Sequence, residues 1–194
     1  AAQPTATATT AAPAVGAATV FEIEQASSGA RFVIDEVLNG SPFTVNGTTD
    51  QVAGQIAFDL SNPSAAQVGT IQINARTLAT DSTRRDQAIK NQVLKTDANE
   101  YITFVPTALV GLPTSVTTGQ SYTFQIVGQL TLVGQSHEAT FAVTVTPTAA
   151  GTLEGHATTT ITYADWGISI PQVPSVASVD DTVTLALTFV ATAK

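Results

Sequence analysis

YTFQIVGQLTLVGQSHEATFAVTV, residues Tyr122–Val145, is the stretch that decides the fold. Bulky apolar residues stand at alternate positions through its first half, apart from Gly128, and the same alternation returns from Phe141 onward. In an extended strand, this pattern places the apolar side chains on one face and Thr, Gln and Ala on the other. Gly134–Glu138 interrupts the pattern and indicates a turn. The stretch therefore predicts a long β-hairpin with one apolar face.

Other segments of the chain repeat this alternation. The clearest is Thr182–Val190, in which Val, Leu and Phe alternate with Thr and Ala. Two strands cannot bury an apolar face by themselves, so further strands must cover it. About eight strand signals with little helix predict an all-β protein, and a closed or nearly closed antiparallel β-barrel is the simplest arrangement that leaves no exposed edge.

Two Asn-Gly pairs lie in the first part of the chain, at Asn39–Gly40 and Asn46–Gly47. Asn-Gly favours the positive φ angles of tight turns between antiparallel strands. The sequence therefore predicts a turn at each pair, with a small strand around Phe43 and Val45 between them.

The period of the pattern changes in residues 80–99, TDSTRRDQAIKNQVLKTDAN. Apolar residues at helical spacing, with Asp81 or Ser82 as N-cap, predict one or two short helices around residues 82–96. This segment could anchor a negatively charged group, but a solvated helix whose Arg85 and Asp86 pair with neighbours is the more common arrangement. Five of the seven basic residues lie in or beside it: Arg76, Arg84, Arg85, Lys90 and Lys95.

Residues 1–18, AAQPTATATTAAPAVGAA, carry no charge and little that could be buried. Such a segment cannot offset the entropy lost on ordering, so we predict a flexible tether before one domain at residues 19–194. Thr/Pro tracts are common in stalks outside the cytoplasm, which favours an extracytoplasmic protein tethered to the cell surface. A native stalk and a remnant of processing both remain open as the origin of this segment.

Charge and composition argue against several function classes. The net charge is −8, and binding to a phosphate backbone requires a basic face, so nucleic acid is not an expected partner. Cysteine is absent, and no apolar run approaches the roughly 18 to 20 residues that span a bilayer. The two histidines, His137 and His156, have no spacing typical of a metal site or a catalytic triad. We therefore predict no metal, no cofactor and no enzyme activity.

Several landmarks together resemble the YceI-like family of bacterial polyisoprenoid-binding proteins, over nearly all of Thr19–Val190. The most specific are Leu78–Thr80 leading to Arg84–Asp86, the segment GQLTLVG at Gly128–Gly134, and the Asp165–Gly167 turn. The resemblance implies a lipocalin-like antiparallel barrel whose elongated apolar pore holds an isoprenoid chain. It also implies a secreted or periplasmic protein that is often a homodimer.

We predict that apolar residues on one face of the strands line this pore and contact the ligand. Each buried methylene contributes roughly 0.8 kcal/mol, so a long prenyl chain could be held without a hydrogen bond to its tail. If a diphosphate head is bound, Arg84 and Arg85 are the candidates. Trp166 is expected to cap the mouth of the barrel and to contact the ligand there. The predicted lining is Phe32, Ile34, Phe58, Ile71, Ile73, Phe104, Phe124, Ile126, Leu130, Phe141, Val143, Leu185 and Leu187.

Three classes of function stay open at this point. A carrier or store of an isoprenoid-type lipid requires an open pore. A stalk-borne extracellular interaction module would instead have a barrel packed solid with side chains and no lipid ligand. A hydrolase or isomerase acting on the lipid would need polar groups that converge deep in the pore, for which the sequence has no signal.

Overall fold

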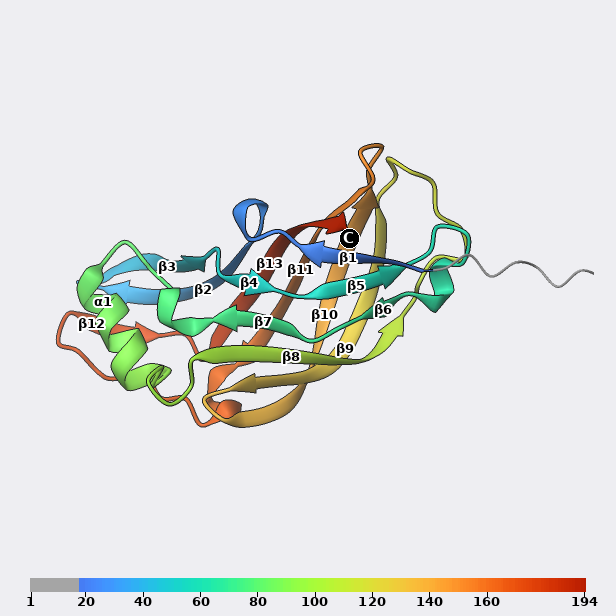
Figure 1. The fold of residues 1–194 in the computed structure, drawn as a ribbon. Coiled ribbons are helices and arrows are strands. Elements are labelled where there is room, and N and C mark those ends of the chain that lie inside the picture. Colours follow the sequence, from blue (N-terminus) through green and yellow to red (C-terminus); the bar gives the residue numbers. More distant parts are fainter. Residues whose placement is uncertain (1–17) are drawn as a thin grey trace, which may run out of the picture.

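Strands occupy most of residues 18–194, the part of the chain that the computed structural model describes (Figure 1). They pair into one sheet, and every pairing is antiparallel, as the alternating patterns indicate. The strands are β1 (Thr19–Ile23), β2 (Gly29–Leu38), β3 (Ser41–Thr49), β4 (Val52–Ala53), β5 (Gln55–Phe58), β6 (Gln67–Val68), β7 (Ile71–Asn74), β8 (Tyr101–Val110), β9 (Tyr122–Leu132), β10 (Gln135–Pro147), β11 (Thr152–Thr162), β12 (Val176–Val179) and β13 (Thr182–Ala193).

The predicted hairpin is formed by β9 and β10. The strands pair from Tyr122 opposite Val145 to Leu132 opposite Gln135. Val133 and Gly134 make the turn with φ angles of 49° and 75°. The turn is therefore shorter than the break in the alternation indicated, since residues 135–138 already belong to β10.

The sheet closes on itself through two interrupted strands. β4 and β5 are separated only by Gly54, and between them they pair with β7, β6 and β1. β6 and β7 are likewise parts of one stretch, and β7 pairs onward with β8. Because β1 also pairs with β13, the path through β5, β7, β8, β9, β10, β11 and β13 returns to β1. The predicted all-β antiparallel barrel is confirmed.

One end of the barrel carries an extension, which we call the α1 end. There β2 pairs with the first half of β13, with β12 and with β3. The helix α1 (Thr83–Ala88) lies at this end near β2, β3 and β12 (Figure 1), and a π-helical turn at Ile89–Val93 continues it. The hydroxyl of Ser82 caps α1 by accepting a bond from the backbone nitrogen of Arg85 at 3.4 Å. The predicted short helices around residues 82–96 are confirmed.

Of the two predicted Asn-Gly turns, one is present and the other is wrong. Asn39 and Gly40 connect β2 to β3 with φ angles of 51° and 79°. Asn46–Gly47 lies instead inside β3, where Gly47 pairs with Phe32 of β2. A β-carbon on Gly47 would lie 2.0 Å from Cε1 of the Phe32 ring. The glycine is needed here because an aromatic ring covers its backbone, a contact that the local sequence does not reveal.

The predicted tether, residues 1–18, lies outside the described residues except for Ala18. Between residues 18 and 194, no helix has the length and apolar character needed to cross a membrane. The same part of the chain contains no group of three or more His, Cys, Asp or Glu residues placed to hold a metal ion.

Candidate functional site

The barrel contains a cavity of about 1190 Å³. Ligand pockets for small molecules usually measure about 300 to 1000 Å³, so this space is large even for such a site. A small barrel can instead be filled by its own side chains. The interior of this barrel is not filled, so the solid core expected of an interaction module is absent from the described structure.

All thirteen apolar residues of the predicted lining border this cavity. They come from β2, β5, β7, β8, β9, β10 and β13, which lie far apart in the sequence and meet only in the closed barrel. Their assignment as ligand contacts stays a prediction. The residues are Phe32, Ile34, Phe58, Ile71, Ile73, Phe104, Phe124, Ile126, Leu130, Phe141, Val143, Leu185 and Leu187.

Many of these side chains are only half-buried although they point inward. Phe32, Phe124 and Leu185 belong to this group. In a filled core, the inward face of a strand would be fully buried. The remaining exposure of these side chains is therefore consistent with surface that faces the open cavity.

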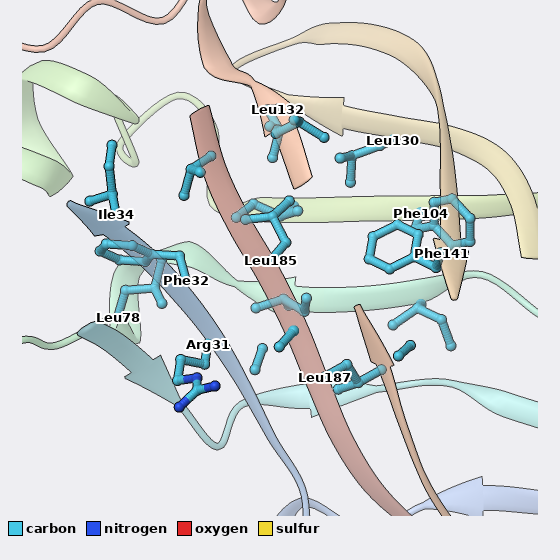
Figure 2. Close-up of a pocket in the computed structure, with 18 of the residues that line it drawn as sticks. Arg31, Phe32, Ile34, Leu78, Phe104, Leu130, Leu132, Phe141, Leu185 and Leu187 are labelled. Carbon is cyan, nitrogen blue, oxygen red and sulfur yellow. The ribbon is translucent and has the colours of Figure 1, made fainter. Parts of the chain in front are cut away.

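Two phenylalanine rings form the tightest aromatic contact in the wall. The rings of Phe104 and Phe141 lie edge to face, with centroids 4.8 Å apart and planes at 64°. Figure 2 shows this pair at one side of the cavity, and Phe32, Ile34 and Leu78 at another. The Phe104 ring also covers Gly128, where a β-carbon would lie 2.6 Å from its Cζ atom. Gly128 thus gives the ring its position in the wall.

Four charged side chains border the cavity at the α1 end: Glu36, Asp81, Arg84 and Arg85. The Arg85 guanidinium donates to Glu36 at 3.2 Å and to Asp81 through its other terminal nitrogen. It also lies 5.5 Å from the centre of the Phe43 ring. The neighbouring Asp86 accepts from the backbone and hydroxyl of Thr80, both at 2.7 Å. Pairing of Arg85 and Asp86 with neighbours, one of the two sequence-based alternatives, is therefore present.

Arg84, the other candidate for a head group, differs from Arg85. Its side chain borders the cavity, is exposed and forms no ion pair with any residue between 18 and 194. The two arginines are brought to the same end of the cavity, but only one has an unengaged guanidinium.

Tyr163 adds a hydroxyl to the cavity lining, just after β11. Burial raises the pKa of Tyr163, and the nearby carboxylates of Asp181 and Asp180 raise it further. Because a free tyrosine already titrates near pH 10, the hydroxyl stays protonated at neutral pH. It can act as a hydrogen-bond donor and acceptor.

Trp166 does not belong to the lining. Its side chain is 4% exposed, and its indole nitrogen donates to the backbone oxygen of Leu130 at 2.9 Å. The His137 ring packs edge to face on it, with centroids 5.2 Å apart. Gly167, with a φ of 67°, ends this 3₁₀ turn. The residue therefore joins the turn after β11 to the β9–β10 hairpin instead of facing the cavity.

Several lining residues were missed from the sequence. Leu132, Val183 and Phe189 share the parity of neighbours that were chosen, so the alternation could have identified them. Others lie in segments without a periodic pattern, where no sequence signal exists. These are Leu112, Pro113 and Val116 between β8 and β9, and Ile170, Pro171, Val173 and Pro174 before β12.

Comparisons with known proteins agree on one family. A model of the YceI-like domain matches residues 21–191. BcnA of Burkholderia cenocepacia has a TM-score of 0.70 at 18% identity, over 88% of this chain and 99% of that chain. A polyisoprenoid binding domain from Saccharophagus degradans, implicated in plant cell wall breakdown, has a TM-score of 0.69 at 13% identity, over 91% and 99%. The YceI protein of Campylobacter jejuni has a TM-score of 0.59 at 15% identity, over 76% and 84%.

At these identities the solved structures show a shared fold. No curated protein matched the chain.

Proposed function

The chain belongs to the YceI-like domain family, and on this premise we propose that its cavity binds a long isoprenoid-type lipid, which the protein carries or stores unchanged. The observation that supports the proposal is the open apolar cavity of about 1190 Å³. The Saccharophagus degradans neighbour, a polyisoprenoid binding domain, supports the same class of ligand.

Binding of such a lipid would be driven by removal of its chain from water. Each methylene transferred into the cavity contributes roughly 0.8 kcal/mol, and the lining supplies mainly aliphatic and aromatic contacts. A wall of this kind recognises length and bulk, and it discriminates weakly between lipids of similar shape.

Affinity should therefore rise with the length of the prenyl chain. Geraniol, farnesol and geranylgeraniol differ by one five-carbon unit each, and each added unit should tighten binding by more than about tenfold while the cavity has room. Equilibrium binding of the three alcohols measures this. Equal affinities for all three would refute binding of the chain inside the barrel.

Transport or storage without chemistry is part of the proposal. Lipid that has been incubated with the protein should be recovered unchanged by organic extraction and mass spectrometry. Recovery of a hydrolysed or isomerised lipid, absent from a heat-denatured control, would show that the protein is an enzyme.

We further propose an extracytoplasmic location and a homodimer, as the family resemblance implies. Fractionation of the host's cells should find the protein outside the cytoplasm, and sedimentation should give twice the mass of one chain. Protein found in the cytoplasm would refute the proposed location, and a monomer at micromolar concentration would refute the proposed dimer.

A further inference from the structure

The charged side chains that border the cavity are concentrated at its α1 end, so a lipid should place its polar head there. Toward the opposite end the lining includes Leu112, Pro113, Val116 and Pro147, and burying a polar head among them would be unfavourable. Arg31 also borders the cavity, but it is exposed and belongs to the opposite face of β2 from Phe32. The four charged residues of the α1 end are Glu36, Asp81, Arg84 and Arg85.

The positive charge of Arg85 is already neutralised. Both terminal nitrogens of its guanidinium donate to carboxylates, one to Glu36 at 3.2 Å and the other to Asp81. The side chain of Glu36 is only 9% exposed, so its charge depends on Arg85 for compensation. An anionic head group could bind the Arg85 guanidinium only by displacing one of these carboxylates.

The charges at this end cancel, because two carboxylates face two guanidinium groups. Asp180 and Asp181 lie near Tyr163 and add negative charge beside the same part of the cavity. A diphosphate would meet like charges at Glu36 and Asp81, and of the two arginines described at this end only Arg84 is unengaged. Uncharged groups are available for other head groups, since Ser82, Gln87 and Asn91 of the α1 segment and Tyr163 also border the cavity.

We propose that the α1 end selects lipids with an uncharged, hydrogen-bonding head, such as a prenyl alcohol, over prenyl diphosphates, and that Glu36 and Asp81 impose this selection. The inference rests on the proposed function, and it names the head-group class of the same site.

Geranylgeraniol and geranylgeranyl diphosphate test this selection, because they share one tail and differ in the head. The unchanged protein should bind the alcohol at least about tenfold more tightly, because the charged diphosphate would leave water for a site whose four charged side chains carry no net positive charge. Glu36→Gln and Asp81→Asn should each reduce that ratio, and the double variant should reduce it by at least about tenfold. Arg84→Gln should weaken binding of the diphosphate by a larger factor than binding of the alcohol, and so raise the affinity ratio.

Asp35→Asn is the matched control. Asp35 precedes Glu36 on β2 and is exposed on the opposite face, so its substitution changes the net charge equally without altering the cavity. The affinity ratio should stay at the value of the unchanged protein. A ratio that moves equally in Asp35→Asn and Glu36→Gln would overturn the assignment, because net charge alone would then explain the effect.

The remaining outcomes separate this inference from the proposed function. If neither lipid binds, the proposed function fails. If the diphosphate binds as tightly as the alcohol or more tightly, the proposed function stands and the selection is refuted. Thermal unfolding checks that each variant is folded. If Glu36→Gln does not fold, the affinity ratio of Asp81→Asn tests the selection instead. The Asp81 side chain is 61% exposed, so its substitution disturbs no buried group.

Discussion

Two glycines show how single residues set the shape of the cavity wall. At Gly47, the three atoms nearest to a β-carbon would all belong to the Phe32 ring, which can turn toward the open cavity. At Gly155, it would lie 2.4 Å from the backbone oxygen of Thr144, which belongs to the paired strand β10 and cannot move freely. The same substitution should therefore have different costs at the two positions.

We expect Gly47→Ala to lower the free energy of unfolding by about 1 kcal/mol, and Gly155→Ala by about 3 kcal/mol, as overpacking typically does. Gly69→Ala is the control, since its nearest neighbour would be a backbone oxygen at 3.4 Å. Urea unfolding of the three variants measures their losses in the free energy of unfolding. Equal losses at Gly47 and Gly155 would contradict the roles given to the ring and the backbone.

We expect Trp166 to contribute to stability and not to binding. Trp166→Phe removes the bond to the Leu130 backbone oxygen and should lower the free energy of unfolding by about 1 to 2 kcal/mol. Affinity for geranylgeraniol should stay within about twofold, because the indole does not border the cavity. A large loss of affinity in a variant that is still folded would restore Trp166 to the ligand site.

At the scale of elements, the alternation in β9 and β10 separates the wall of the cavity from the outer surface. Phe124→Ala and Phe141→Ala should each weaken geranylgeraniol binding by about tenfold, since each removes a ring from the wall. Thr123→Ala and Thr140→Ala are the controls on the outer faces of the same strands. Comparable losses in the threonine variants would show that the ligand does not lie inside.

The same elements show why part of the site could be predicted. A period of two fixes which side chains point inward, so the thirteen predicted strand residues border the cavity, and the missed Leu132, Val183 and Phe189 share the same alternation. Segments without a period do not indicate which side chains point inward. Pro171 and Val116 lie in such segments, and they border the cavity because of the course of their loops. Asn46–Gly47 was misassigned because a ring contact from another strand, and not the local turn preference, determines the glycine.

On the scale of the whole molecule, closure of the barrel depends on pairings that local patterns do not specify. β1 joins β13 at one edge and β5 at the other, and the ring is completed because the chain changes partners at Gly54: β4 before it pairs with β7, and β5 after it pairs with β1 and β6. Alternation is compatible with both a filled and a hollow barrel, because it fixes which way the side chains point and not how much space they leave inside the barrel. The sequence therefore could not predict the cavity of about 1190 Å³, which only the structure shows.

Native mass spectrometry of the protein purified from its own host tests the central claim most directly. We predict a mass above that of the polypeptide, an excess that organic extraction removes, and a prenyl lipid with an uncharged head in the extract. A mass equal to the polypeptide alone, and unchanged after addition of geranylgeraniol, would contradict a lipid-binding barrel.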